Sequence, residues 1–309
     1  MYDLIIIGGG PAGVAAGVYA ARKRLKTMLI TESFGGQSTD SLGIENWIGT
    51  IKISGPDLGK ALEAHIKEYT SKPDTTIESK SERVELVEKS ASGFVVKTSA
   101  GSYETKTVLV ATGSTRRKLE VPGAAAYENK GITYCASCDG PLFSGQDVVV
   151  IGGGNAGFES AAQLLAYCKS VTLLQRSGAY KADEMTVESV LKHPNMKGIL
   201  NAAIKEVKGE KFVKSLVYTD TTTNTDHEIP VTGVFVEIGL IPTTGFVSAL
   251  VAQNEIKQII ADPKTQRTSV EGVWAAGDCT DGLYHQNNIA AGDAVKALED
   301  IYMYVRTGK

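Results

Sequence analysis

The feature that most constrains the fold is a duplicated pattern, in which an apolar run leads into the spacing Gly-x-Gly-x-x-Gly and then a helix-like segment. One copy comprises Leu4–Ile7 and Gly8–Gly13, and the other comprises Val148–Ile151 and Gly152–Gly157. In such units the first glycine makes a tight turn, the second lets a pyrophosphate approach, and the third lets helix and strand pack closely. The unpaired N–H groups at the helix start are available to phosphate oxygens. The duplication therefore predicts two nucleotide-binding units in one chain.

Each unit has further expected parts. Thr27–Ile30 predicts a second strand, and Glu32 after it is the acid expected to hold a ribose hydroxyl about 20 residues beyond the glycine loop. Short alternating strands in 84–105 predict an antiparallel meander, which precedes an apolar strand that runs from Val108 into Ala111-Thr112-Gly113. The second half repeats this order, with a strand at 171–174, a meander around 213–218 and a final strand at 234–239. The fold class is therefore α/β, with two Rossmann-like units that each carry a meander.

Composition limits the classes of function. The 309 residues are 42% hydrophobic and 22% charged with a net charge of −3, so no basic surface indicates nucleic-acid binding. The apolar start is too short for a signal peptide or a membrane span. Few cysteines and no export signal favour a reducing, cytoplasmic setting.

Two of the four cysteines form Cys135-Ala-Ser-Cys138, followed directly by Asp139. This spacing can close a short disulfide and lowers a thiol pKa, and the carboxyl could transfer a proton to or from a leaving sulfur. The alternatives are a zinc half-site or a structural loop, but structural zinc takes four Cys or His ligands and no second pair exists. We therefore expect redox chemistry and no metal. Cys168 is expected inside the second helix as a buried filler, and Cys279 has no base or partner cysteine to make it reactive.

Taken together, the motifs resemble the low-molecular-weight thioredoxin reductases and the similar reductase module of alkyl hydroperoxide reductase flavoproteins. The resemblance covers essentially the whole chain, and the motifs that carry it are Gly8–Gly13, Gly35-Gly36-Gln37, Glu45-Asn46, Ala111-Thr112-Gly113, Cys135–Gly140, Gly152–Gly157 and Gly272–Asp278.

The resemblance implies FAD at the first glycine motif and a nicotinamide dinucleotide at the second. It also implies a split FAD domain, residues 1–115 and 246–309, with an NAD(P)H domain of residues 116–245 inserted in it. The implied FAD-site residues are Gly8, Gly10, Pro11, Ala12, Gly13, Glu32, Gly36, Gln37, Asn46, Ala111, Thr112, Gly113, Gly277, Asp278, Gln286 and Asn287. The implied nicotinamide-site residues are Gly152, Gly154, Asn155, Ala156, Gly157, Arg176 and Lys181. Asp278 would hold the ribityl chain, and Gln286 with Asn287 would lie along the isoalloxazine.

The family's mechanism assigns roles to the redox residues. By resemblance Cys138 faces the flavin, Cys135 attacks the disulfide of a thioredoxin-like partner, and Asp139 manages the proton. The enzyme would be a homodimer that rotates one domain against the other. The chain lacks the fused thioredoxin-like domains of the hydroperoxide reductase flavoproteins, so the acceptor is expected to be a separate protein. The alternatives are an NADH-using reductase of a peroxiredoxin- or glutaredoxin-like protein, a dithiol oxidase that passes electrons to oxygen, and a redox sensor without turnover.

Two departures from the family pattern bear on the cofactors. NADPH-binding members carry His-Arg-Arg and a further Arg where this chain has Gln175, Arg176, Ser177 and Lys181. One Arg is missing, and Lys cannot make the same bidentate fork on a phosphate. No acid stands at Gln175 to hold a ribose hydroxyl, as an NADH enzyme would prefer, so we expect NADPH with NADH open. The alternative to a phosphate-binding role is that Arg176 and Lys181 are solvated surface cations. The second departure is His285, where the family has Arg before the Gln.

Overall fold

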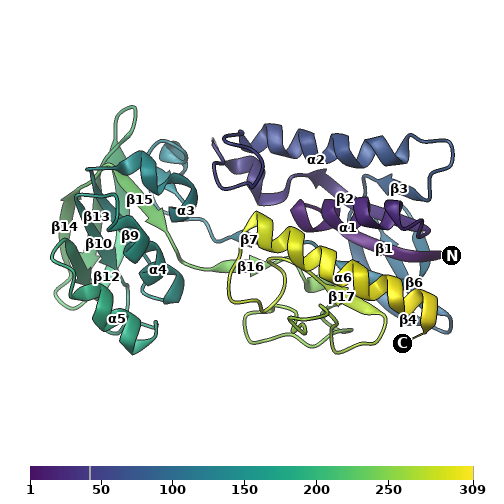
Figure 1. Cartoon of the computed structure of the whole chain (residues 1–309). Helices are drawn as coiled ribbons and strands as arrows, with labels where there is room; N and C mark the ends of the chain where they lie inside the picture. Colours follow the sequence, from purple (N-terminus) through teal and green to yellow (C-terminus); the bar gives the residue numbers. More distant parts are fainter. Residues whose placement is uncertain (42, 309) are drawn as a thin grey trace. The chain divides into compact units, whose positions relative to one another are not determined.

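A computed structural model describes residues 1–41 and 43–308. The chain divides into two compact units, Met1–Thr115 with Ile241–Lys309 and Arg116–Leu240 (Figure 1). It passes between them in β7 (Ser114–Arg116) and β16 (Leu240–Pro242), which pair as a two-stranded ribbon. The return passage thus lies between residues 240 and 241, whereas the sequence placed it between 245 and 246.

The first unit is built on one mixed sheet with strand order β3-β2-β1-β6-β5-β4, and β17 pairs with β6. Its strands are β1 (Tyr2–Gly9), β2 (Thr27–Phe34), β3 (Ile77–Lys80), β4 (Val84–Ser90), β5 (Gly93–Thr98), β6 (Ser102–Val110) and β17 (Val273–Ala275). Its helices are α1 (Pro11–Arg22), α2 (Gly55–Thr70), α6 (Asn287–Thr307) and the 3₁₀ turns η1 (Gly36–Asp40) and η4 (Gly245–Val247).

The side chains of β1 pack into a separate core on each face of this sheet. Leu4 and Ile6 pack into a core with α1, α2 and α6, whereas Ile5 and Ile7 pack into a second core with the meander strands. All four side chains are buried, which requires the continuous apolar run because successive side chains point to opposite faces.

The predicted meander and the predicted strand after it are not separate elements. β6 is one strand, which pairs antiparallel with β5 near Tyr103 and parallel with β1 near Val108. The strand starts polar and ends apolar because its first half pairs with the meander strand β5, whereas its second half lies between β1 and β17.

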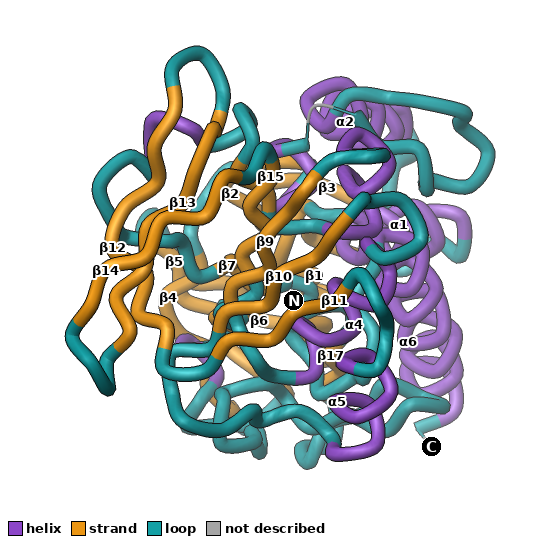
Figure 2. The backbone as a smooth tube through the Cα atoms, turned by 90° about the vertical axis from the view of Figure 1, so that its left-hand side faces the viewer, coloured by secondary structure: helices purple, strands orange, loops and turns teal. Residues whose placement is uncertain are grey.

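In the second unit the parallel strands and the meander strands form two separate sheets. Its parallel sheet has the order β11-β10-β9-β15-β8, and β12-β13-β14 form an independent antiparallel sheet (Figures 1 and 2). The strands are β8 (Ile132–Thr133), β9 (Asp147–Ile151), β10 (Ser170–Leu174), β11 (Met196–Ile199), β12 (Ala202–Gly209), β13 (Val213–Asp220), β14 (Thr225–Pro230) and β15 (Gly233–Val236). The helices are α3 (Ala136–Asp139), α4 (Asn155–Leu164), α5 (Glu184–Leu191), and the 3₁₀ turns η2 (Ala125–Tyr127) and η3 (Gly140–Phe143). The α/β class with two nucleotide-binding units and a meander in each is confirmed.

The prediction that Cys168 lies inside the second helix is wrong. α4 ends at Leu164, and Cys168 lies in the turn before β10, where its N–H donates to the Leu164 carbonyl at 2.8 Å. The side chain is nevertheless buried, at 6% exposure. Sequence spacing overestimated the helix because the chain turns after Leu164 to enter β10.

No helix within residues 1–41 and 43–308 is long and apolar enough to cross a membrane. In the same described ranges, no three His, Cys, Asp or Glu side chains are grouped so that they could hold a metal ion.

Candidate functional site

The first unit contains a cavity of about 710 Å³ at the carboxyl ends of its parallel strands. It is lined by the first glycine loop, by the end of β2, by the segment after β6 and by the start of α6. The predicted FAD-site residues in its lining are Gly8, Gly10, Pro11, Ala12, Glu32, Gly36, Gln37, Ala111, Thr112, Gly113, Gly277, Asp278 and Asn287. Its volume lies within the usual range for cofactor pockets, about 300–1,000 Å³.

The three motif glycines Gly8, Gly10 and Gly13 have distinct surroundings. Gly8 has φ +119°, and a Cβ there would lie 2.3 Å from the Ala111 carbonyl oxygen. A Cβ on Gly13 would lie 1.8 Å from the Gly8 oxygen, so this glycine serves the contact between helix and strand and does not line the cavity. A Cβ on Gly10 would meet nothing within 4 Å. Gly10 therefore presents open backbone to the cavity at the start of α1, where a pyrophosphate would bind.

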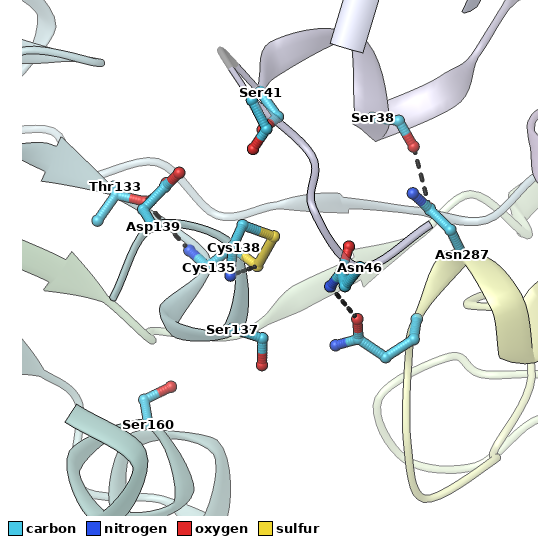
Figure 3. The surroundings of a disulfide bond; sticks show 12 residues. Ser38, Ser41, Asn46, Thr133, Cys135, Ser137, Cys138, Asp139, Ser160 and Asn287 are labelled. Carbon is cyan, nitrogen blue, oxygen red and sulfur yellow. Dashed lines mark hydrogen bonds between the residues drawn. A yellow bond between two sulfur atoms is a disulfide. The ribbon is translucent and has the colours of Figure 1, made fainter. Parts of the chain in front are cut away.

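Several polar contacts shape the cavity. Gln37 Nε2 donates to Ser114 Oγ at 3.2 Å, and Ser38 Oγ donates to Asn287 Oδ1 at 3.0 Å (Figure 3). Neither Ser38 nor Ser114 was predicted from the sequence, because no spacing rule relates them to their partners.

Asn46 and Gln286 lie outside the cavity lining and contact each other instead. Asn46 Nδ2 donates to Gln286 Oε1 at 3.2 Å (Figure 3). Asn288 Nδ2 donates to the Asn46 carbonyl at 2.7 Å. These bonds tie the loop around Asn46 to the start of α6. Nearby, His285 Nε2 is buried without a hydrogen-bond partner among the described residues.

The second glycine loop repeats the geometry of the first. Gly152 has φ +122°, a Cβ on it would lie 2.2 Å from the Glu237 oxygen, and a Cβ on Gly157 would lie 1.9 Å from the Gly152 oxygen. Gly154, like Gly10, has open space around its missing Cβ. Asn155 and Ala156 form the first turn of α4, and Asn155 Oδ1 accepts from the Asp183 N–H at 2.9 Å. The duplicated glycine roles are therefore present in both units.

The residues after β10 would face the adenosine half of a dinucleotide. Gln175 is buried and committed to the loop: its Oε1 accepts from the Gly153 N–H at 3.1 Å, and its Nε2 donates to Ser177 Oγ at 2.7 Å. Arg176 and Lys181 are both exposed, and the Lys181 N–H donates to the Gly153 carbonyl at 2.7 Å. Two cations thus flank this loop.

Cys135 and Cys138 are joined by a disulfide directly after β8, with their Cα atoms 5.3 Å apart (Figure 3). The Cys138 N–H donates to Cys135 Sγ at 3.2 Å. Thr133 donates a hydrogen bond to Asp139, and its Oγ1 also accepts from the Cys135 N–H at 3.3 Å. Thr133 therefore links the acid to the disulfide, a role that the sequence did not reveal.

Burial raises the pKa of the Asp139 carboxyl, while the Thr133 hydrogen bond and the positive charge of Arg116 oppose that rise. A carboxyl whose pKa moves toward neutrality is better suited to hold and release a proton beside a sulfur. Cys279 is different: it is completely buried, and burial raises the pKa of its thiol to about 12, so it is not a second nucleophile.

A model of the family described as pyridine nucleotide-disulphide oxidoreductase matches residues 2–294. Among solved structures, thioredoxin reductase from Streptococcus pyogenes MGAS5005 is 33% identical with a TM-score of 0.89, and that from Giardia duodenalis is 31% identical with a TM-score of 0.91. Each match covers 99% of this chain and 99% of the other.

Curated relatives are longer proteins. A component of alkyl hydroperoxide reductase from Escherichia coli (strain K12) is 41% identical over 308 residues, which is 98% of this chain and 58% of that protein. A protein named NADH dehydrogenase from Bacillus subtilis (strain 168) is 39% identical over 304 residues, again 98% of this chain and 58% of that protein. The chain therefore spans little more than half the length of these relatives.

Proposed function

The chain belongs to the pyridine nucleotide-disulphide oxidoreductase family, and we propose on this basis that it reduces the disulfide of a small thioredoxin-fold protein. Electrons would pass from NAD(P)H through FAD and the Cys135–Cys138 disulfide. The observation that carries this proposal is that disulfide, with Asp139 linked to it through Thr133, in a unit that also holds a nucleotide-type glycine loop. Solved thioredoxin reductases that match over nearly their whole length support it.

The cavity of the first unit fits the FAD part of the proposal. Gly10 leaves backbone open for the pyrophosphate, the exposed Glu32 carboxylate at the end of β2 would accept from a ribose hydroxyl, and Asp278 would face the ribityl chain. FAD, when bound, supplies two-electron chemistry that the side chains lack.

We assign the partner-facing step to Cys135. Its thiolate attacks one sulfur of the partner disulfide, which forms a mixed disulfide and releases the other partner sulfur as a thiolate that takes up a proton. The Cys138 thiolate then attacks Cys135 Sγ, which restores the intramolecular disulfide and releases the second partner thiol. The Cys138 N–H would stabilise the Cys135 thiolate, and Asp139 would hold the proton that the leaving sulfur needs.

NADPH is the proposed nucleotide because Arg176 and Lys181 are exposed beside the loop that would receive the adenosine ribose. A charge-assisted hydrogen bond contributes about 1.5–3 kcal/mol, so one such contact gives a preference of roughly ten- to a hundredfold. A homodimer is proposed with it, to be tested by sedimentation.

A second candidate is an NADH-dependent reductase of a peroxiredoxin- or glutaredoxin-like protein. The observation that favours it is the 41% identity to the alkyl hydroperoxide reductase component together with 39% identity to a protein named NADH dehydrogenase. The buried, neutral Gln175 is compatible with either nucleotide.

One assay separates these candidates. Protein reconstituted with FAD would be supplied with NADPH or NADH and with oxidised thioredoxin, a peroxiredoxin or oxygen alone as the acceptor. The proposal expects NADPH-dependent reduction of thioredoxin that exceeds oxygen consumption. Faster turnover with NADH and a peroxiredoxin would replace it by the second candidate, and turnover with oxygen alone would indicate a dithiol oxidase.

The cysteine roles are tested by trapping. Cys138→Ser leaves Cys135 without its resolving partner, so the chemically reduced variant is expected to accumulate a mixed disulfide with oxidised thioredoxin on a non-reducing gel. Cys135→Ser is the matched control and is expected to trap little. The opposite pattern would reverse the two roles.

A further inference from the structure

Ala111 in the first unit and Glu237 in the second occupy equivalent backbone positions but have different side chains. The carbonyl of Ala111 crowds the first glycine of the first loop, and the carbonyl of Glu237 crowds the first glycine of the second loop in the same way. Each residue directly follows the strand that pairs with the unit's first strand, β6 in one unit and β15 in the other. The first unit therefore has a methyl group where the second has a carboxylate.

This carboxylate is held in place by the neighbouring helix. Ser160, which lies on α4 and is 8% exposed, donates from Oγ to Glu237 Oε1 at 2.7 Å (Figure 3 labels Ser160). Arg116 and Glu159 are the charged groups that act on Glu237, and Asp139 follows β8, the strand beside β15. Burial raises the pKa of the Glu237 carboxyl, while Ser160 and Arg116 oppose the rise and Glu159 adds to it.

The turn itself does not require an acid. The first unit makes the same approach of carbonyl to glycine with Ala111, which is 4% exposed and lines the FAD cavity. Placing a carboxylate at a half-buried position costs desolvation free energy. A residue that the fold does not need and that is unfavourable to bury is a candidate for ligand binding.

The first unit also indicates where a ligand would run in the second. Its cavity extends from Glu32 after β2, past the glycine loop, to Ala111–Ser114 after β6. The equivalent path starts at Arg176 after β10, passes Gly152–Gly157 and reaches Glu237 after β15. With the adenosine half at the Arg176 end, the nicotinamide half would pass Glu237.

We propose that Glu237 binds the nicotinamide end of the dinucleotide and favours its oxidised form. The oxidised pyridinium ring carries a positive charge, whereas the dihydronicotinamide ring is neutral. A carboxylate beside the ring attracts only the oxidised form, because a neutral ring has no net charge to attract. The inference rests on the proposed function, since it requires a nicotinamide dinucleotide in the second unit. Its consequence is that Glu237 makes loss of hydride more favourable on the enzyme and slows release of NADP⁺.

The test compares the affinity of the FAD-loaded protein for a dinucleotide with a charged nicotinamide ring and for one with a neutral ring. NADP⁺ and 1,4,5,6-tetrahydro-NADPH, whose neutral ring cannot give up hydride, would be titrated by calorimetry. Glu237→Gln removes the charge and keeps the shape, so NADP⁺ affinity is expected to fall about tenfold, or about 1.4 kcal/mol. Affinity for the tetrahydro analogue is expected to change less than about twofold, or about 0.4 kcal/mol. Glu210→Gln, at an exposed glutamate that pairs with Lys214 in the same unit, is the matched control and should change neither.

The pH dependence gives a second readout. Because the ionised carboxylate attracts the pyridinium, NADP⁺ affinity of the native protein should rise with pH through the acid range, and Glu237→Gln should lose that part of the rise. Ser160→Ala keeps the charge but removes the hydrogen bond that favours ionisation, so its rise should move to higher pH. This variant also tests the inference if Glu237→Gln folds poorly.

The outcomes are distinct. Equal losses for both rings, or no loss for either, would overturn the role of Glu237 while leaving a functioning nucleotide site. Failure of the native protein to bind either nucleotide would overturn the proposed function, and this inference with it.

Discussion

Gly10 caps α1 and Gly13 lies in its first turn, and the structure predicts opposite consequences of replacing each by alanine. A Cβ on Gly13 would lie 1.8 Å from the Gly8 carbonyl oxygen, whereas ordinary contact begins at about 3.4 Å. The difference is about 1.6 Å, and the clashing atom is backbone, so a side-chain rotation cannot relieve it. α1 would have to move away from β1, although it is packed against α2 and α6. Overpacking of this kind costs about 1–3 kcal/mol, occasionally more.

Gly10 has the opposite surroundings. A Cβ there would meet nothing within 4 Å, and the residue has φ −75°, which alanine adopts without strain. Reduced freedom of the unfolded chain would stabilise Gly10→Ala by about 0.4–1 kcal/mol. Alanine is a poorer N-cap than glycine by a similar amount, so the two effects offset each other and the net change is within about 0.5 kcal/mol. The added methyl would, however, occupy the path of the FAD pyrophosphate.

The assay therefore separates fold from cofactor binding. Apo protein would be unfolded with urea to obtain the free energy of unfolding, and FAD affinity would be measured by the quenching of flavin fluorescence. We expect Gly13→Ala to lose about 1–3 kcal/mol of stability. We expect Gly10→Ala to keep its stability and lose roughly ten- to a hundredfold in FAD affinity, about 1.4–2.8 kcal/mol. A Gly10→Ala variant that binds FAD normally would refute the assignment of this loop to the pyrophosphate, and a stable Gly13→Ala variant would refute the packing argument.

Variants at three further positions test other parts of the structure. Asp139→Asn should slow dithiol–disulfide exchange with the partner about 10²- to 10⁴-fold in stopped-flow measurements. Burial raises the pKa of this carboxyl in the folded state, so its ionisation reduces native stability as pH rises. Asp139→Asn should therefore unfold at a higher urea concentration than the native protein at pH 8, and at a similar concentration near pH 3. A larger gain in stability at low pH would contradict this sign. Asp300→Ala should cost about 1–3 kcal/mol in urea unfolding, because the indole N–H of the buried Trp274 loses its acceptor at 2.9 Å and Arg267 loses its ion pair; Asp300→Asn keeps an acceptor for the indole but not the charge, so it should restore part of that loss. Arg176→Ala should lower kcat/KM for NADPH by a factor equivalent to about 1.5–3 kcal/mol and leave kcat/KM for NADH unchanged, and added salt should weaken the NADPH preference of the native protein. Equal losses of kcat/KM for both nucleotides would place this cation on the solvated surface.

Local pattern was enough to predict most of the fold. The apolar runs of β1 and β9, the glycine spacing and the following helices are all short-range features, because strand burial and tight turns depend on neighbouring residues. For the same reason the spacing of Cys135 and Cys138 and the adjacent Asp139 can be read from the chain alone. The errors occurred where a local pattern was interrupted by its surroundings, as at Cys168, where the chain leaves α4 to enter β10.

Only the tertiary structure brought together residues that are distant in the chain. Ser38 with Asn287, and Ser160 with Glu237, are hydrogen-bonded pairs separated by whole elements, and no periodicity relates their positions. Ala111 and Glu237 occupy equivalent positions because their carbonyls lie against the first glycine of each glycine motif, a contact that forms only in the folded chain. Sequence by itself determined the strands and helices that flank each glycine motif and placed two cysteines within reach of a disulfide, because both depend on adjacent residues. Tertiary structure decided which side chains surround each predicted nucleotide site, because those contacts form only when separate strands and helices pack together.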